Sequence, residues 1–302
     1  MNATITTEAR THADSQGEVM TTRTTTTGAP VAGGGPSPAL KRIVGIARSE
    51  TKRLARWTFA GVGLGVIAFF ALLATVVAFV AGNTGPRMGA MAGSSVDLES
   101  SLGIVAGLAM AADLIGIVIL ALWAAAVSSD YSTGWVRITV QAEPRRWRLV
   151  AGKLLTLTVF TLIATTIATV ISVVAAPLLA NAAGVSTAAW SAGTVGTIAS
   201  AWFNLAVAVL VWGTIGFTIA IVTRSAIVAI AGGIGYLMVF EGLLGMVADE
   251  LTTYLPGSIL DAVVAGGNAT LAYGPALALA ALFGAAAIGI STLVFSRRDV
   301  TS

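Results

Sequence analysis

Six apolar stretches, each long enough to cross a lipid bilayer, constrain this chain more than any other feature of its sequence. They cover approximately residues 58–81, 103–127, 154–180, 196–223, 226–247 and 271–295. A helix rises about 1.5 Å per residue, so about 20 residues cross a hydrocarbon core of about 30 Å. Lipid tails offer no partner to an unpaired backbone group, so such stretches cross as helices. The pattern predicts an all-α membrane protein with six transmembrane helices.

The composition excludes most other classes of protein. Hydrophobic residues make up 56% of the 302 residues and charged residues only 10%, whereas soluble domains carry about 25% charged residues. The chain has no cysteine and a single histidine, His12, so thiolate and multi-histidine metal centres are excluded. No phosphate-binding loop is present, and no nucleophile and base share a depth in the spans. We therefore expect no metal, no cofactor, no nucleic-acid partner and no catalysis by this chain itself.

Two segments precede the first apolar stretch. Residues 1–38 are rich in Thr, Gly, Pro and Ser and lack an aliphatic run, so we expect a disordered tail. Residues 39–57 place apolar side chains at helical spacing among lysines and arginines and end at Trp57. This pattern predicts an amphipathic helix along the membrane surface, with membrane lipids as partners. A solvated helical linker is the alternative.

The distribution of basic residues predicts the orientation of the spans. Of the 17 Lys and Arg residues, all but Arg87 fall in the N-terminal region, the 128–153 loop, the turn at Arg224 or the C-terminal tail. Basic residues accumulate on the cytoplasmic side of membranes, so both termini are expected there. Arginine outnumbers lysine, as is common in proteins of GC-rich bacteria, and we expect a multi-pass protein of a bacterial plasma membrane. On the outer side, segment 248–270 is apolar although Pro256–Gly257 interrupts it, which predicts a helical hairpin that dips toward the membrane.

The most polar connection is the 128–153 loop, which runs from Ser129 to Lys153 between the second and third spans. Its positions resemble the permease subunits of type-2 ABC exporters, which carry an acidic residue, a glycine four positions later, a basic residue, a proline followed by arginine, and Gly-Lys at the start of the third span. The corresponding residues are Asp130, Gly134, Arg137, Pro144, Arg145, Arg146, Gly152 and Lys153. The chain differs in having Asp130 where glutamate is more usual and Trp135 where many members have threonine.

This resemblance covers residues 39–298 and implies a function. It implies an exporter permease that forms half of a translocation pathway, with a second copy or a sibling permease as the other half. ATP and Mg²⁺ would bind a separate P-loop ATPase subunit, which would dock on the 128–153 loop. Arginine and tryptophan are favoured anchors at protein interfaces, and the loop carries both types. Judged from residue types alone, the arginines fit a second role equally well, in which they orient the spans in the membrane and contact lipid headgroups.

Three polar residues inside the spans are further site candidates. Asp113 falls near the middle of the second span, Asn204 lies in the fourth and Glu241 in the fifth. A charge at membrane depth faces the bundle interior, a wet cavity or a partner, and marks a functional-site candidate. Asp113, Asn204 and Glu241 are therefore candidates for lining the pathway, although the residue types favour the alternative role for Asn204 and for Glu241 and fit both roles equally for Asp113. The alternatives are helix packing for Asp113, an interhelical hydrogen bond for Asn204 and contact with the membrane surface for Glu241.

Two other functions fit the same pattern of spans. In an ATP-independent secondary carrier, Asp113 and Glu241 would couple transport to protons and the 128–153 loop would be incidental. A non-transporting scaffold or sensor subunit would use the spans only for assembly. An adjacent gene for a P-loop ATPase would favour the exporter.

Overall fold

The computed structural model describes residues 38–54, 57–83, 97–142, 146–191, 193–241, 243–244 and 252–297. The chain divides into two units, Met1–Pro38 and Ala39–Ser302, and the architecture below is that of the second. The tail expected over residues 1–38 lies outside the described residues, apart from Pro38.

Helices and short turns account for the described part of the chain, which contains no strand. The elements are α1 (Pro38–Leu54), α2 (Trp57–Asn83), η1 (Gly103–Val105), α4 (Ala106–Ser132), α5 (Trp135–Ala142), α6 (Arg146–Ala183), η2 (Ala188–Ser191), α7 (Thr194–Thr223), α8 (Ala226–Gly235), the π-helical η3 (Tyr236–Glu241), α11 (Pro256–Ala265) and α12 (Tyr273–Arg297). Five of them, α2, α4 with η1, α6, α7 and α12, are long and apolar enough to cross a membrane. The expected all-α class is confirmed, and the chain has the structure of a multi-pass membrane protein.

The fifth predicted span, residues 226–247, differs from the other five. Helix α8 continues into π-helical η3, and together they form a 16-residue apolar helix, Ala226–Glu241. This helix is too short to count among the long spans, and residue 242 and residues 245–251 lie outside the described part. A π-helix adds a residue to each turn and commonly marks a functional position. The six-span count therefore stays a prediction. In the expected outer hairpin, α11 is the described helix, with Pro256 at its start and Gly266 (φ 76°) after its end.

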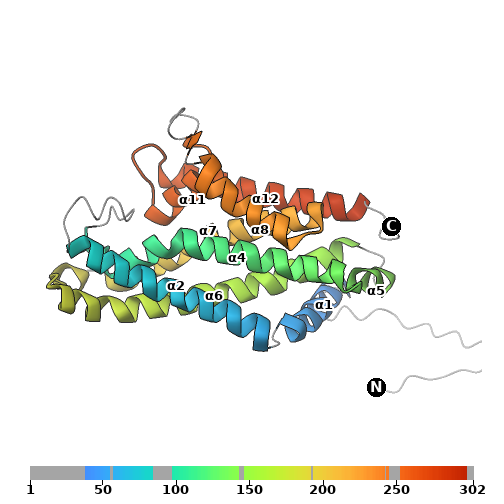
Figure 1. Cartoon of the computed structure of the whole chain (residues 1–302), viewed down its shortest axis with the longest axis horizontal. Helices are drawn as coiled ribbons and strands as arrows, with labels where there is room; N and C mark the ends of the chain where they lie inside the picture. The colour runs from blue at the N-terminus through green and yellow to red at the C-terminus, as the bar shows by residue number, and fades with distance from the viewer. Residues whose placement is uncertain are drawn as a thin grey trace, which may run out of the picture. The chain divides into compact units, whose positions relative to one another are not determined.

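Helix α4 lies at the centre of the bundle and packs against α2, α7 and α8, while α12 packs on α7 and α11 (Figure 1). Glycine permits the closest approach in this core. A Cβ on Gly216 of α7 would lie 2.5 Å from the carbonyl oxygen of Leu120 in α4, a separation that no side chain tolerates. Gly107 of α4 approaches Thr75 of α2 just as closely, at 2.4 Å from a Cβ to the hydroxyl oxygen. Small residues thus set the helix spacing, as is common in membrane bundles.

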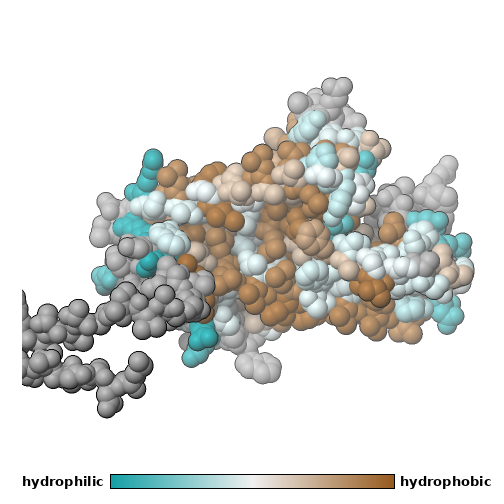
Figure 2. Space-filling model, turned by 180° about the vertical axis from the view of Figure 1, so that it is seen from behind, coloured by the Kyte–Doolittle hydropathy of each residue, from teal (hydrophilic) through white to brown (hydrophobic). Residues whose placement is uncertain are grey.

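The outer surface of the bundle is apolar. Figure 2 shows hydrophobic residues across the middle of one face and hydrophilic residues gathered toward its ends. Large exposed side chains on three different helices contribute to the apolar surface, namely Phe69, Ile163 and Leu282. A soluble protein rarely exposes so extensive an apolar patch, so this surface fits contact with lipid tails.

The segment expected as the 128–153 loop is largely helical. Helix α4 continues past the apolar stretch to Ser132, α5 follows, and α6 begins at Arg146. The turn between α4 and α5 contains Gly134 at φ 69°, a left-handed conformation that favours glycine. The prediction placed helix ends where hydropathy falls, but hydrogen bonding carries these helices beyond the apolar part of the sequence.

Candidate functional site

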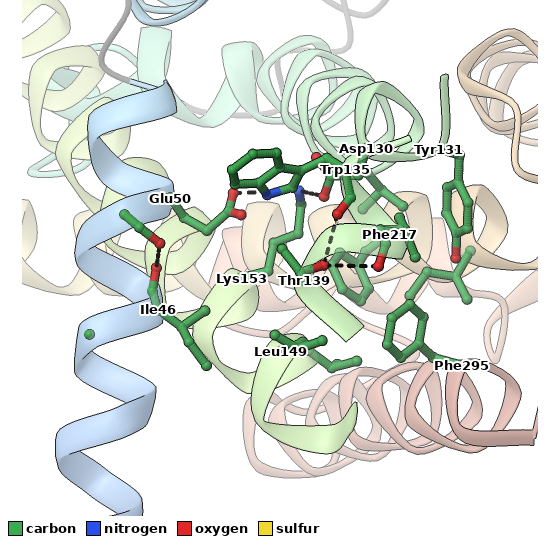
Figure 3. A pocket seen from close by; sticks show the side chains of 16 residues that line it. Ile46, Glu50, Asp130, Tyr131, Trp135, Thr139, Leu149, Lys153, Phe217 and Phe295 are labelled. Atoms are coloured by element: carbon green, nitrogen blue, oxygen red, sulfur yellow. Dashed lines mark hydrogen bonds and ion pairs between the residues drawn. The ribbon is translucent and has the colours of Figure 1, made fainter. Parts of the chain in front are cut away.

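Six helices meet around a pocket of about 390 Å³ at the end of the bundle where α1 and α5 lie, called here the α5 end (Figure 3). Helices α1, α4, α5, α6, α7 and α12 all contribute to its wall. The wall is mainly aliphatic and aromatic, and its aromatic residues are Tyr131, Trp135, Phe217 and Phe295. A pocket of this size with few polar groups is typical of a small-molecule site.

The charged part of the described wall is a buried cluster of three residues, called here the ion triad: Glu50, Asp130 and Lys153. The Lys153 ammonium pairs with the Asp130 carboxylate and lies 3.6 Å from the Glu50 Oε2 (Figure 3). The side chains of Lys153 and Glu50 are each 9% exposed and that of Asp130 is 12% exposed. Burying an ion is costly unless an opposite charge compensates it, so the Lys153 ammonium and the two carboxylates stabilise one another in the folded chain.

Packing of α1 against α6 brings Glu50 to the triad. A Cβ on Gly152 would lie 2.6 Å from Ile46, so glycine allows α1 to lie directly on α6. Beside this contact, the Thr156 hydroxyl donates to the Ala47 carbonyl oxygen at 3.1 Å. The interpretation of the sequence missed Glu50. Glu50 could have been recognised from the composition, because it is the single acidic residue in the basic segment 39–57.

The residues predicted for docking divide between the pocket and the surface. Asp130 and Lys153 belong to the ion triad, whereas Trp135 lines the pocket and is also 39% exposed. Arg146 donates to the Ser296 carbonyl oxygen of α12 at 3.4 Å. The Arg137 backbone lies in α5, and the structure does not describe its side chain; Pro144 and Arg145 lie outside the described residues.

An apolar surface at the α5 end includes one residue that the sequence did not single out. Ile138, on α5, is 58% exposed, and Trp147, at the start of α6, is 47% exposed. Trp135 stands one helical turn before Ile138, and residues three apart are neighbours on a helix surface. Trp135 and Ile138 are called here the α5 surface.

Asp113 pairs with a residue that the sequence did not link to it. Its carboxyl group hydrogen-bonds that of Asp261 in α11. Both side chains are exposed, and Asp113 is the single exposed residue of α4 between Ala106 and Ser128. The pair places two carboxyl groups beside each other at an exposed position of the central helix.

Glu241 and Asn204 each form hydrogen bonds with a neighbouring helix. The Glu241 Oε1 accepts hydrogen bonds from the Ser258 backbone N–H at 2.8 Å and from its hydroxyl at 3.2 Å. Ser258 lies in the first turn of α11, where a carboxylate satisfies free N–H groups and faces the positive end of the helix dipole. Asn204 Oδ1 accepts from the Tyr273 hydroxyl of α12 at 2.5 Å. Of the three intramembrane candidates, the structure shows interhelical bonds for all, and it joins Asp113 to Asp261 rather than to Asn204.

The described residues contain no group of three or more side chains suited to a metal ion. Comparison with known proteins also leaves the family open, since no family model and no curated protein matches the chain.

We expect replacement of Asp113 to show whether its pair with Asp261 stabilises the bundle. Asp113→Asn keeps a hydrogen bond to Asp261 and should melt close to the wild type in detergent. Asp113→Leu removes that bond and should cost about 1–2 kcal/mol of stability. The double variant Asp113→Leu/Asp261→Leu should recover stability, because no polar group then lacks a partner. Equal melting of all three variants would contradict a stabilising carboxyl pair.

Proposed function

We propose that this chain is the membrane-spanning permease subunit of an ATP-binding cassette exporter. The observation that carries the proposal is the arrangement at the α5 end, where a short helix with exposed apolar residues lies against the ends of the long helices. This arrangement suits a docking element for a separate motor subunit. The spacing of the residues from Asp130 to Lys153 and its resemblance to type-2 exporter permeases support the same role.

The ion triad would connect the proposed docking element mechanically to the neighbouring helices. It joins α1, α4 and α6 through buried charges that are costly to separate, and α5 connects α4 to α6 along the chain. Movement of α5 by an ATPase would therefore move these three helices together. ATP and Mg²⁺ would bind the partner ATPase, and a second copy or a sibling permease would complete the pathway.

The proposal includes six spans with both termini in the cytoplasm of a bacterial cell. The chain has no cysteine, so single cysteines report topology directly. A membrane-impermeant maleimide applied to intact cells should label Thr187→Cys, beside η2, and should not label Ser132→Cys until the membrane is opened. Both residues are exposed. Labelling of Ser132→Cys in intact cells would contradict this orientation.

The function is tested by purifying the tagged chain from its native membrane. A P-loop ATPase, identified by mass spectrometry, should copurify in stoichiometric amount and give vanadate-sensitive hydrolysis of ATP. A chain that purifies intact and folded without such a subunit, under conditions that preserve other transporter complexes, would contradict the exporter.

One observation favours a second candidate, the ATP-independent secondary carrier. The Asp113–Asp261 carboxyl pair, exposed in α4 and α11, is the kind of group that couples transport to protons. The two candidates differ in their energy source. Transport by the chain alone in proteoliposomes, driven by a proton gradient without ATP or a second subunit, would favour the carrier.

A further inference from the structure

We propose that the α5 end carries a specific site for one anionic phospholipid, called here the lipid site. The phosphate of the lipid lies on Arg48 and Lys52 of α1, and one acyl chain enters the pocket beside them. The lipid site is a property of the chain alone, so it does not depend on an ATPase partner. Three observations support it: two basic side chains without a partner, an apolar pocket next to them and an opening that joins the two.

The first observation is a pair of cations on the outer side of α1. Arg48 and Lys52 are exposed and stand four residues apart, so they are neighbours on the helix surface. Neither side chain has a hydrogen bond or an ion pair in the described part of the chain. The acidic residue between them, Glu50, is buried and lies beside Lys153 on the inner side. Basic residues of this kind near a membrane surface attract lipids with a negative headgroup.

Four other basic residues at the α5 end have partners within the protein. Arg146 donates to a carbonyl oxygen of α12, and Lys153 belongs to the ion triad. Arg224 lies over the Tyr131 ring, 5.7 Å from its centroid, and Arg148 lies at the same distance from the ring of the tryptophan before it. The two cations of α1 are therefore the better placed to hold a phosphate.

The second observation is the apolar pocket. Its volume of about 390 Å³ lies within the range of about 300–1,000 Å³ typical of sites for small organic ligands. Val127, Val136 and Leu149 come from three different helices, and Phe217 and Phe295 add aromatic rings to the wall. Such a lining favours a hydrocarbon chain, which gains from leaving water and has no polar group to satisfy.

The charged residues of the wall do not exclude an apolar ligand. Lys153 pairs with Asp130 and lies 3.6 Å from the Glu50 Oε2, so these charges have partners within the protein. Figure 3 shows the ion triad gathered on one side of the pocket, while Phe217 and Phe295 lie on another side. An acyl chain therefore lies against the aliphatic and aromatic part of the wall.

The third observation is an opening between the pocket and the two cations. Gly45 and Ser49 of α1 line the pocket and are exposed at the same time. Arg48 follows Gly45 by three residues and Lys52 follows Ser49 by three, so each cation stands beside this opening on the helix surface. No side chain extends from Gly45 to narrow the opening, and nothing lies within 4 Å of the place where its Cβ would be. A chain attached to a phosphate on these cations therefore reaches the pocket directly.

The cations and the pocket together select a phospholipid over other ligands. A free phosphate would use the cations and leave the pocket without a ligand, whereas a neutral lipid would use the pocket and leave both cations unpaired. The chain has the structure of a multi-pass membrane protein with an apolar outer surface. Membrane phospholipid is therefore the molecule at hand that carries both an anionic headgroup and acyl chains.

The test compares two lipids with the same acyl chains, phosphatidylglycerol and phosphatidylcholine. The full chain in detergent is titrated with each lipid, and native mass spectrometry counts the lipids bound per chain. One phosphatidylglycerol should bind with an affinity about tenfold or more above that of phosphatidylcholine, because two cations contact its net negative headgroup. Equal affinities, or no saturable binding, would overturn the proposal. Glycerophosphoglycerol, the headgroup without acyl chains, should not displace the lipid, and displacement at equal concentration would overturn the role of the pocket.

The first variant tests the two cations. Arg48→Gln/Lys52→Gln changes two exposed side chains and should weaken phosphatidylglycerol binding about tenfold while leaving phosphatidylcholine binding unchanged. The matched control is Arg10→Gln/Arg23→Gln, which removes the same two charges from the segment before α1 and should bind as the wild type does. Equal weakening by the two double variants would reveal an effect of net charge alone and overturn the proposal.

The second variant tests the pocket. Gly45→Leu places a side chain at the opening, where no other atom lies within 4 Å of the added Cβ. It should weaken phosphatidylglycerol binding about tenfold, because excluding about two methylene groups from an apolar site has an effect of this size. Gly61→Leu is the matched control, since Gly61 is also an exposed helical glycine with open space around it, and it should leave binding unchanged.

The outcome is kept separate from folding and from the proposed exporter. Melting curves identify a variant that has lost its fold, and both lipid-site variants leave the ion triad intact. Unchanged phosphatidylglycerol binding in either folded variant would overturn the proposal. Because no ATPase is present in the assay, its failure would leave the exporter untouched, and failure to copurify an ATPase would leave the lipid site untouched.

Discussion

Lys153→Met is expected to be the most damaging single substitution in the described part of the chain. It leaves Glu50 and Asp130 buried beside each other with their shared cation removed. Breaking a buried ion pair by removing one partner costs about 3–5 kcal/mol, because the remaining buried charge loses an opposite charge. For a chain of this size, we expect the detergent melting temperature to fall by roughly 10 °C.

Two further variants distinguish this mechanism from loss of packing. Lys52→Met removes a lysine from the exposed side of α1 and should leave melting nearly unchanged. The triple variant Glu50→Gln/Asp130→Asn/Lys153→Met removes all three charges and should recover most of the stability, because replacing a whole buried ion cluster is often close to neutral. A triple variant as unstable as Lys153→Met would show that the charges are not the source of the effect.

Ile138→Asp is expected to release the ATPase subunit of the proposed complex without unfolding the permease. Ile138 is 58% exposed on α5, so aspartate at this position remains in contact with water and the helix persists. In an interface centred on the α5 surface, a charge in place of a buried anchor should cost about 2 kcal/mol or more. The ATPase should then bind roughly 30-fold more weakly, and stoichiometric copurification should be lost.

The control for this variant is Val195→Asp, which introduces the same charge at an aliphatic residue that is 82% exposed at the start of α7. It should keep the ATPase bound. Ile138 tests docking more specifically than the arginines do, because replacing Arg146 would also remove its hydrogen bond to the Ser296 carbonyl oxygen of α12. Normal copurification and coupled hydrolysis by Ile138→Asp would remove α5 from the docking interface.

The local parts of the structure could be predicted from the sequence. Apolar stretches of sufficient length predicted the five long helices within a few residues at most ends, because hydropathy and helical hydrogen bonding depend on neighbouring residues. Where polar residues follow an apolar stretch, the prediction was less accurate. Helix α6 begins at Arg146, eight residues before the predicted start at 154, because a helix continues through polar residues beyond the membrane.

Some residues of the candidate site could be identified from the sequence, whereas their partners depend on contacts between segments far apart in the chain. The resemblance to exporter permeases implied Asp130 and Lys153 as site residues, but nothing in the sequence indicated that they would meet Glu50. Likewise, the depth of Asp113 marked it as a candidate, whereas its partner Asp261 lies in a helix that the sequence assigned to an outer hairpin. A buried charge requires a partner, but the sequence does not say which one.

The sequence by itself determined that the chain is helical, apolar on its outside and built to cross a membrane. These properties follow from the free energy of transferring each segment between water and lipid, which is nearly independent of the other segments. The tertiary structure alone decided which charges meet, which polar residues hold helices together and where a pocket remains. Those outcomes depend on contacts between helices far apart in the chain, such as glycine-mediated packing of α1 on α6 that carries Glu50 to Lys153.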